Sequence, residues 1–406
     1  MYHTKSLNKT SEIQITGSKS ESNRLLILQA LYPNITIENL SESDDTMYLK
    51  KALLSEEKVI DIHHAGTAMR FLTAYFASKE NKDVLLTGSD RMQERPIGIL
   101  VDALRDLGAD IEYEKKEGFP PLFIKGKKLL KNQVSIAANT SSQYLSALLL
   151  IASSLPIGLT LSLEGETTSR PYLTMTLELL KQLGIESVFS EKVISIPHYE
   201  AIEKKTLIVE SDWSSASYFY SIVALSEGME ISLKSYRYNS LQGDAALSEI
   251  YKNLGVNTKF IPEKNVLQLS KINSYKPNKV SFNLVNTPDI AQTIVVTCFG
   301  LGVECNLTGL HTLKIKETDR LLALKIELEK LGATVTITED SLILLSSKNI
   351  LENTSIATYN DHRMAMAFAP LALKTTLQIE DSEVVSKSFP TFWQDLKTLG
   401  FSVHFQ

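Results

Sequence analysis

A helix that ends in Leu-Gly and runs into an alternating stretch recurs five times along this chain. The glycines are Gly108, Gly184, Gly255, Gly332 and Gly400, which lie 68 to 77 residues apart. Each is typical of a helix that ends in a left-handed glycine, and the period-two pattern after each predicts a strand. A single Leu-Gly pair would mean little, because many helices end this way, but five at similar spacing indicate an internal repeat. An eroded sixth copy ends near Ile62.

Six further helical segments lie between these markers and are rich in small residues. They are SNRLLILQALY, GTAMRFLTAYFAS, SSQYLSALLLIASSL, SSASYFYSIVALSEG, PDIAQTIVVTCFGLG and NDHRMAMAFAPLAL. A helix that is apolar on nearly all sides is buried, and we expect Ser, Thr or Asp to cap each of them. The predicted unit is strand, buried helix, strand, exposed helix and strands, with three copies in each of two α/β (α+β) domains. The buried helices would point their positive N-terminal ends at one place.

Composition narrows the class of protein. A chain of 406 residues is too long for one ordinary core. Its net charge of −5 offers no general basic surface, so neither nucleic acid nor membrane is expected as a partner. We see no signal peptide and no apolar run of membrane-spanning length. The two cysteines, Cys298 and Cys305, have no metal-binding spacing and favour a cytoplasmic protein without a metal.

Arginine is used sparingly, in places where it would bind anions. Seven of the nine arginines fall in short polar motifs: Arg24, Arg70, Arg91, Arg95, Arg170, Arg320 and Arg363. A guanidinium binds a carboxylate or phosphate through two parallel hydrogen bonds, whereas a lysine is only a point charge. The pattern predicts a ligand that carries several anionic groups.

Most of these motifs lie at predicted helix starts. GSKSESNR (17–24) combines a glycine, hydroxyls and Lys19 in the manner of an anion site, although a capped helix with surface charge is the alternative. It lacks the spacing of a Walker A loop, which disfavours a nucleoside triphosphate. AGTAMR (65–70) repeats the arrangement. RMQERP (91–96) predicts a loop before a helix that begins at Pro96.

Two other motifs place carboxylates beside cations. KIKETDR (314–320) predicts a helix with Lys316 and Arg320 on one face, or alternatively a solvated ladder of ion pairs. Asp289, in TPDIAQ, precedes an apolar helix as Asp361 does in NDHRM. Such a carboxylate is either a helix cap or a general base next to cationic groups.

The motifs GSKSESNR, AGTAMR, RMQERP, SSQYL, SRPY, SSASYF, LQGD, KETDR and YNDHRMAM occur in this order. With them the chain resembles the 5-enolpyruvylshikimate-3-phosphate synthase family from Gly17 to about Pro390. The resemblance implies an inverse α/β barrel fold of two domains, each with three βαβαββ units and buried parallel helices. One domain would be residues 18–210 and the other residues 1–17 with 211–406, with the active site in the cleft between them.

The resemblance also implies an activity in the shikimate pathway, which leads to chorismate and the aromatic amino acids. The enolpyruvyl group of phosphoenolpyruvate would pass to the 5-hydroxyl of shikimate 3-phosphate through a tetrahedral intermediate, and phosphate would be released. It implies a monomer that binds two small molecules and uses no cofactor. The related UDP-N-acetylglucosamine enolpyruvyl transferases generally have a cysteine in the loop equivalent to RMQERP, and this chain has none before Cys298. A catalytically silent binding protein of the same fold is the other alternative.

The site residues that the resemblance implies fall into three groups. Asp289 would accept the proton of the 5-hydroxyl, Glu317 would donate a proton to C3, and Lys19 is the third catalytic residue. Shikimate 3-phosphate would be bound by Lys19, Ser20, Arg24, Ser141, Ser142, Gln143, Ser169, Tyr172, Asp289 and Lys316. Phosphoenolpyruvate would be bound by Lys19, Gly66, Arg91, Gln143, Arg320, Arg363 and Lys387. The chain departs from the family pattern at His64 (usually Asn), Phe71 (usually Pro), Gln93 (usually Lys) and Thr312 (often Asn).

Overall fold

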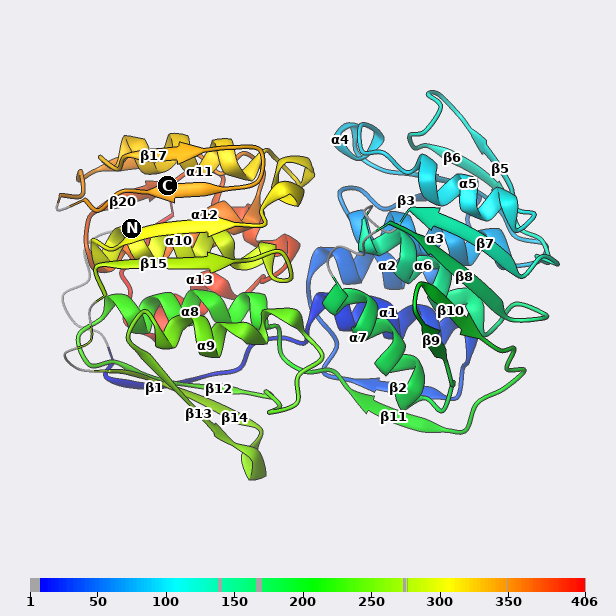
Figure 1. Cartoon of the computed structure of the whole chain (residues 1–406), viewed down its shortest axis with the longest axis horizontal. Helices are drawn as coiled ribbons and strands as arrows, with labels where there is room; N and C mark the ends of the chain where they lie inside the picture. The colour runs from blue at the N-terminus through cyan, green and yellow to red at the C-terminus, as the bar shows by residue number, and fades with distance from the viewer. Residues whose placement is uncertain are drawn as a thin grey trace. The chain divides into compact units, whose positions relative to one another are not determined.

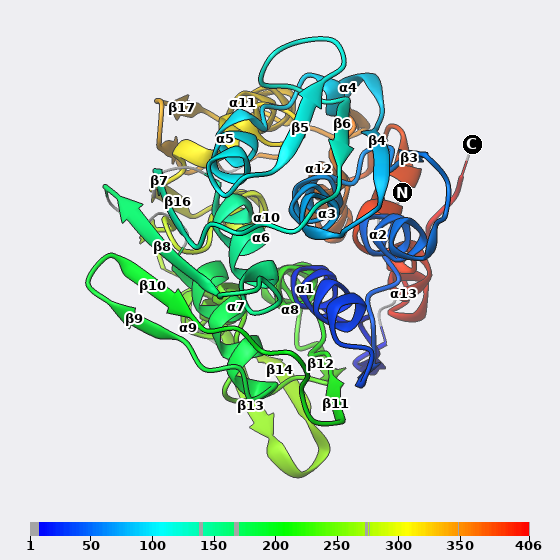
Figure 2. The same cartoon turned by 90° about the vertical axis from the view of Figure 1, so that its right-hand side faces the viewer.

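The structure is a computed structural model that describes residues 8–137, 141–165, 170–272, 275, 277–347 and 349–405. The chain divides into two units (Figures 1 and 2). Gly17–Val209 form one, called the inserted unit here. Met1–Thr16 and Glu210–Gln406 form the other, called the split unit because its two segments flank the inserted one.

The inserted unit contains three sheets, with strand orders β3-β4-β6-β5, β7-β8-β10-β9 and β11-β2. Its strands are β2 (Ile35–Glu38), β3 (Val59–Asp61), β4 (Asp83–Thr87), β5 (Asp110–Tyr113), β6 (Leu122–Lys125), β7 (Gln133–Ala137), β8 (Leu159–Glu164), β9 (Val188–Ser190), β10 (Val193–Ile196) and β11 (Lys205–Ile208). Its helices are α1 (Lys19–Leu31), α2 (Asp44–Leu54), α3 (Gly66–Ser78), α4 (Asp90–Gln93), α5 (Gly98–Asp106), α6 (Ser142–Ala152) and α7 (Arg170–Gln182).

The split unit also contains three sheets, with strand orders β1-β12-β14-β13, β15-β16-β18-β17 and β19-β20. Its strands are β1 (Thr10–Ile13), β12 (Glu230–Lys234), β13 (Val256–Ile261), β14 (Val266–Lys271), β15 (Lys279–Asn283), β16 (Glu304–Thr308), β17 (Val335–Ile337), β18 (Leu342–Leu344), β19 (Thr354–Ile356) and β20 (Leu377–Ile379). Its α-helices are α8 (Trp213–Leu225), α9 (Leu247–Lys252), α10 (Ala291–Leu301), α11 (Arg320–Lys330), α12 (His362–Phe368) and α13 (Phe392–Thr398). Short 3-10 turns are η1 (Gly243–Ala246), η2 (Pro262–Lys264), η3 (Pro288–Ile290), η4 (His311–Ile315), η5 (Ala369–Leu373) and η6 (Ser382–Lys387).

All four four-stranded sheets have the same topology. In each, the first two strands in the order pair in parallel, and the remaining pairs are antiparallel. Parallel neighbours need a long crossover, and α3, α6 and α10 each provide one between the two parallel strands of their sheet. The repeated strand and helix order confirms the α/β fold of repeated units that the sequence predicts.

The buried helices form the core of each unit. Every residue of α12 is buried, and so is every residue of α8 except Ser214. Hydroxyl groups join α8 to α10: Ser217 and Thr293 bond at 2.9 Å, and Thr297 donates to Ser221 at 2.8 Å. Because these buried polar groups are satisfied, the two helices can pack closely. None of the described helices is both long enough and apolar enough to cross a membrane.

The Leu-Gly repeat is confirmed for the helix ends and only partly for the strands. All five glycines have positive φ, between 81° and 102°. Strands β5, β9, β13 and β17 follow the first four, but residues 401–405 after Gly400 form no strand, so that prediction was wrong. Phe401 is buried and the ring of Phe405 lies 6.5 Å from that of Trp393. This segment is therefore held by side-chain packing and not by pairing with another strand.

The expectation that a polar side chain caps every buried helix was wrong for half of them. Ser141, Asp212 and Asp361 do accept a backbone N–H at the starts of α6, α8 and α12. Helices α1 and α3 begin without a side-chain cap, and α10 continues from the 3-10 turn η3. Backbone N–H groups at an uncapped helix start suit an anionic ligand.

Candidate active site

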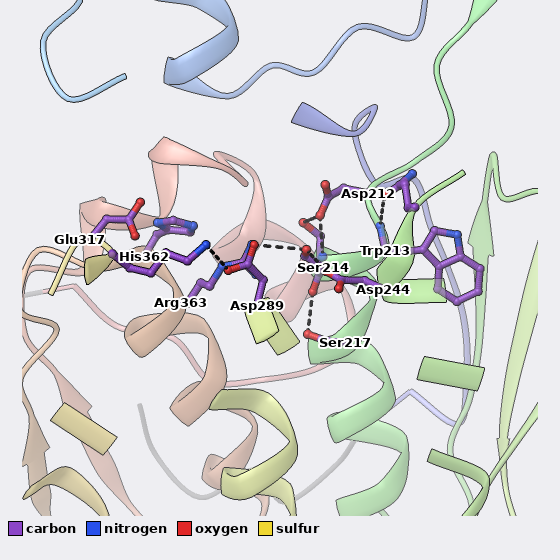
Figure 3. A network of polar contacts seen from close by, with 12 residues as sticks. Asp212, Trp213, Ser214, Ser217, Asp244, Asp289, Glu317, His362 and Arg363 are labelled. Carbon is purple, nitrogen blue, oxygen red and sulfur yellow. Dashed lines mark hydrogen bonds and ion pairs between the residues drawn. The ribbon is translucent and has the colours of Figure 1, made fainter. Parts of the chain in front are cut away.

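Seven charged residues of the split unit form one cluster, called the carboxylate–arginine cluster here. Its members come from η3, the loop after η4, and the starts or ends of α11, α12 and η6: Asp289, Lys316, Glu317, Arg320, Asp361, Arg363 and Lys387. Figure 3 shows Asp289 with Arg363 beside it and Glu317 nearby. The structure thus brings together every site residue that the resemblance implies for this unit.

Asp289 has three cationic neighbours. Its Oδ1 atom lies 3.0 Å from Nη1 of Arg320 and 3.2 Å from Nζ of Lys316. Its Oδ2 atom lies 3.6 Å from Nη2 of Arg363. Burial would raise the pKa of Asp289, but the three cations outweigh burial and hold that pKa well below the ordinary 3.8. Asp289 is therefore ionised at neutral pH.

Glu317 lies on the other side of the same guanidinium. Its Oε2 atom is 2.7 Å from Nη2 of Arg320, and its Oε1 atom is 3.0 Å from Nζ of Lys387. The side chains of Glu317 and Asp289 are 14% and 13% exposed, so both carboxylates remain accessible. One arginine thus holds two carboxylates at fixed positions.

Asp361 in turn fixes Arg320. Its Oδ2 atom accepts from Nε of Arg320 at 2.6 Å, and its Oδ1 atom accepts from the backbone N–H of Arg363 at 2.9 Å. Burial alone would lower the pKa of Arg320, but its three carboxylate partners raise it above the ordinary 12.5. Asp361 was not among the predicted site residues, although its place before an apolar helix was the available signal. It sets the positions of both cluster arginines.

The predicted helix over KIKETDR was wrong in its start. Asp319 caps α11 by accepting from the backbone N–H of Leu322 at 3.1 Å, so the helix begins only at Arg320. Aspartate competes for backbone N–H groups and thereby favours helix starts. Lys316 lies in the loop before this cap, and it reaches Asp289 from the loop and not from a shared helical face.

In the inserted unit, the first turns of α1, α3, α6 and α7 are tied together. The described members of this helix-start cluster are Lys19, Ser20, Arg24, Gly66, Ser141, Ser142, Gln143 and Tyr172. Gln143 donates to Oγ1 of Thr67 at 3.3 Å, which joins α6 to α3. Arg24 joins α1 to the other two helices, as described next. Several positive helix ends therefore lie near one another, beside the half-buried Lys19.

Arg24 is held firmly inside this unit. It donates to Oγ1 of Thr176 and Oγ of Ser146, both at 2.8 Å, and to the Ser20 carbonyl at 2.7 Å. The rings of Phe71 and Tyr172 lie 5.5 and 5.9 Å from the guanidinium carbon. Burial lowers the pKa of Arg24 to about 10, so it is still cationic at neutral pH.

The segment around Arg91 differs from its prediction as a loop. Arg91 lies on the short helix α4, which Ser89 caps, and the next helix begins at Gly98 and not at Pro96. The Arg91 side chain is 59% exposed and pairs with Glu94 at 2.8 Å. Arg95, further along, lies over the start of α3, because a Cβ atom at Gly66 would be 2.4 Å from its Nη1 atom.

Arg70 pins the same segment to α3. It donates to the Pro96 carbonyl at 2.9 Å and to the Gly66 carbonyl at 3.2 Å. This role is structural, since both partners belong to the protein. Ser169, the remaining predicted phosphate ligand, lies outside the described residues. Within the described part of the chain, no group of three or more His, Cys, Asp and Glu side chains is arranged to hold a metal ion.

Comparison with known proteins gives one family throughout. The sequence profile described as EPSP synthase (3-phosphoshikimate 1-carboxyvinyltransferase) matches residues 48–396. A 3-phosphoshikimate 1-carboxyvinyltransferase of Bacteroides fragilis is 46% identical over 396 residues, which cover 96% of this chain and 95% of the relative. One from Sulfurovum sp. is 36% identical and covers 96% of both chains. The EPSP synthase structure from Acinetobacter baumannii has the same fold, with a TM-score of 0.79 and 22% identity over 99% of this chain and 98% of that one.

Proposed function

This chain belongs to the EPSP synthase (3-phosphoshikimate 1-carboxyvinyltransferase) family, and we propose roles for its residues in that reaction. The enzyme transfers the enolpyruvyl group of phosphoenolpyruvate to shikimate 3-phosphate. The 5-hydroxyl oxygen adds to C2 and C3 takes up a proton, which gives a tetrahedral intermediate. A proton then leaves C3 as the C2–O bond to phosphate breaks. The observation that supports our assignment is the pair of carboxylates, Asp289 and Glu317, on the single guanidinium of Arg320.

Asp289 accepts the proton of the attacking hydroxyl. Its low pKa keeps it ionised at neutral pH, and its two oxygens are directed by Lys316, Arg320 and Arg363. A weak base in such surroundings acts through position more than through basicity, since the hydroxyl must be held against it.

Glu317 supplies the proton to C3. In the structure it pairs with Arg320 and Lys387, which suits an ionised carboxylate. When anionic substrates bind to those cations, they take over part of the positive charge that acts on Glu317. Binding therefore favours the protonated carboxyl group that a proton donor requires.

The cations of the two clusters bind the substrates' anionic groups. Arg320 and Arg363 hold the carboxylate of phosphoenolpyruvate, since a guanidinium can bind a carboxylate through two hydrogen bonds. At Arg320 the substrate would replace some of the present carboxylate partners. The other phosphoenolpyruvate ligands that we propose are Lys19, Gly66, Arg91, Gln143 and Lys387. For shikimate 3-phosphate we propose Lys19, Ser20, Ser141, Ser142, Gln143, Ser169, Tyr172, Asp289 and Lys316. Arg24 completes this set through the substrate carboxylate, which would replace some of its present protein partners.

The enzyme works, in this proposal, as a cytoplasmic monomer. All of the proposed ligands come from one chain, and Cys298 and Cys305 are buried free thiols, as is usual in a reducing compartment. Light scattering of the purified protein during size-exclusion chromatography measures the number of subunits directly.

Phosphate release from phosphoenolpyruvate tests the function. We expect the purified protein to release phosphate when shikimate 3-phosphate is the acceptor and not when UDP-N-acetylglucosamine is. Release with the UDP-sugar alone would assign the other enolpyruvyl transfer, and release with neither acceptor would contradict both.

A further inference from the structure

Asp244 is a buried carboxyl group next to the carboxylate–arginine cluster that the proposed mechanism does not use. It lies on η1, in the LQGD motif, and is 6% exposed. Figure 3 shows it beside Ser214, on the side away from Glu317 and His362. A buried carboxyl group near an anion-binding arginine opposes the charge that the site requires, so its presence calls for a reason.

Ser214 connects Asp244 to the cluster. Nη2 of Arg363 donates to Oγ of Ser214 at 3.3 Å, and Oγ of Ser214 donates to Oδ2 of Asp244 (Figure 3). The same Nη2 atom lies 3.6 Å from Oδ2 of Asp289. One nitrogen of Arg363 is therefore shared between the proposed base and a serine that Asp244 orients.

The position of Ser214 is itself well determined. It is the second residue of α8, whose start is fixed by Asp212 through the backbone N–H of Ser215 at 2.7 Å. The Ser214 carbonyl accepts from Oγ of Ser217 at 2.6 Å, one turn further along the helix. Because the backbone is held at both points, the Ser214 hydroxyl can transmit a change at Asp244 to Arg363.

The charge of Asp244 depends on its neighbours. Burial and the negative charge of Asp289 raise its pKa from 3.8 to about 7, and the Ser214 hydrogen bond and the Arg363 charge oppose this only in part. Asp212, at the start of α8, raises that pKa further. An ionised Asp244 would be a third carboxylate acting on Arg363, in addition to Asp289 and Asp212. Near neutral pH a substantial share of molecules carries the proton.

We propose that Asp244 is a positioning residue for phosphoenolpyruvate: in its neutral form it orients Arg363 through Ser214 without adding negative charge. The proposal rests on the proposed function, in which Arg363 binds the substrate carboxylate. The neutral carboxyl group still accepts from Ser214 through Oδ2, so the connection is kept while the repulsion of the substrate is removed.

Protonation of Asp244 and binding of the anion favour each other, because linkage between two sites is reciprocal. The KM for phosphoenolpyruvate should therefore rise as the pH rises through about 7 and Asp244 loses its proton. Phosphoenolpyruvate has a titrating phosphate of its own, which contributes equally in every variant. Only the difference between variants reports on Asp244.

The test compares Asp244→Asn and Asp244→Ala with the unmodified enzyme from about pH 6 to about pH 8.5, with Ser221→Ala as the control. Asparagine keeps a neutral group that can accept from Ser214 but cannot ionise. Over this pH range we therefore expect the KM for phosphoenolpyruvate to rise about tenfold less in Asp244→Asn than in the unmodified enzyme. Alanine removes the partner of Ser214 as well as the ionisable group, and we expect a KM about tenfold higher than that of Asp244→Asn at every pH. The KM for shikimate 3-phosphate should change less. Ser221→Ala, which loses a hydroxyl on the same helix that bonds Thr297 and not Ser214, should keep the pH dependence of the unmodified enzyme.

An Asp244→Asn enzyme with the pH dependence of the unmodified chain would overturn the proposal. So would equal effects of the asparagine and alanine variants on both substrates, since that indicates only a loosened fold. Thermal melting of each variant shows whether it is folded. If the unmodified chain releases no phosphate with shikimate 3-phosphate, the proposed function fails and the substrate named here fails with it. Normal turnover with an unaltered pH profile in Asp244→Asn contradicts the role of Asp244 alone.

Discussion

At the scale of single residues, the guanidinium of Arg320 organises the proposed chemistry. It contacts Asp289, Glu317 and Asp361 within 3.0 Å while its side chain is only 2% exposed. A buried arginine with three carboxylate partners is fixed in position, and so are the partners. The two carboxylates to which we assign different protonation states differ in their other neighbours: Asp289 also faces Lys316 and Arg363, whereas Glu317 also faces Lys387.

Asp289→Asn should abolish proton acceptance while the shape of the site is kept. We expect kcat to fall by a factor of roughly 10² to 10⁴, the usual contribution of a general base. The KM for phosphoenolpyruvate should not rise, because the substitution removes a negative charge near Arg363. Steady-state kinetics with both substrates measures this. Asp319→Asn is the matched control, since asparagine caps a helix as well as aspartate does. An unchanged kcat in Asp289→Asn would remove Asp289 from the mechanism.

Arg363→Lys tests the second arginine. Lysine keeps the positive charge but loses the planar fork, so it cannot bind the substrate carboxylate and Ser214 with the same geometry. We expect the KM for phosphoenolpyruvate to rise by about tenfold, which corresponds to the loss of one hydrogen bond to a charged group. The KM for shikimate 3-phosphate serves as the internal reference. Equal affinity for phosphoenolpyruvate in both enzymes would show that its carboxylate binds elsewhere.

At the scale of helices and strands, local signals in the sequence predict the elements well. The glycine ends of helices and the apolar helices are encoded within about ten residues, and the structure confirms both. Signals that compete with one another are harder to weigh. Asp319 caps α11, so the helix predicted over KIKETDR begins only at Arg320, and Ser89 caps the short helix α4 where a loop was predicted.

Links between distant elements could not be predicted from the sequence. Arg363 bonds Ser214 across 149 residues, and Arg320 bonds Asp361 across 41. Neither residue type nor spacing indicates such a pair, because it depends on which helix starts the fold brings together. The positions of the cluster residues on their elements were therefore predictable in part, whereas the role of Asp244 required the structure.

The start of α3 gives a prediction at this scale. In Gly66→Ala, the new Cβ atom would lie 2.4 Å from Nη1 of Arg95, the far end of a flexible side chain. The arginine can move away, so we expect a folded protein with an almost unchanged melting temperature. The KM for phosphoenolpyruvate should rise, because the displaced guanidinium alters the surroundings of Gly66, one of the proposed phosphoenolpyruvate ligands.

Gly98→Ala is the control for this change. It adds the same methyl group at the start of α5, where the nearest atom outside the helix is 3.4 Å away. We expect its kinetics to match those of the unmodified enzyme. If both alanine variants raise the KM equally, the effect belongs to helix starts in general and not to the neighbourhood of Gly66.

At the scale of the whole molecule, the chain order couples the two segments of the split unit. Strand β1 pairs in parallel with β12, although the whole inserted unit lies between them in the sequence. The sheets of the inserted unit, in contrast, are completed within Gly17–Val209, since β11 returns to pair with β2. The stability of the split unit therefore depends on contacts between its first and last segments. Both tryptophans of the chain, Trp213 and Trp393, belong to this unit, so their fluorescence reports on its unfolding.

The pH dependence of this unfolding follows from its buried carboxyl groups. Burial, with the negative charge of Asp289, raises the pKa of Asp244 to about 7, and burial raises that of Asp395 to about 6. Between their ordinary values near 3.8 and these values, the folded state binds more protons than the unfolded state. Rising pH therefore lowers the free energy of unfolding through this interval. Asp289 acts in the opposite direction, but its pKa lies well below 3.8, so its contribution is already complete at pH 5.

We therefore expect denaturant unfolding followed by tryptophan fluorescence to show lower stability at pH 8 than at about pH 5. Asp395→Asn isolates one contribution, because the asparagine amide can still accept from Thr391 but cannot ionise. Its stability should fall less than that of the unmodified chain between the two pH values. Asp340→Asn, an exposed aspartate of the same unit, serves as the control. The stability of Asp395→Asn could instead fall as much between the two pH values as that of the unmodified chain. Asp395 would then have the same pKa in the folded and unfolded states, and its carboxyl group would remain hydrated in the folded protein.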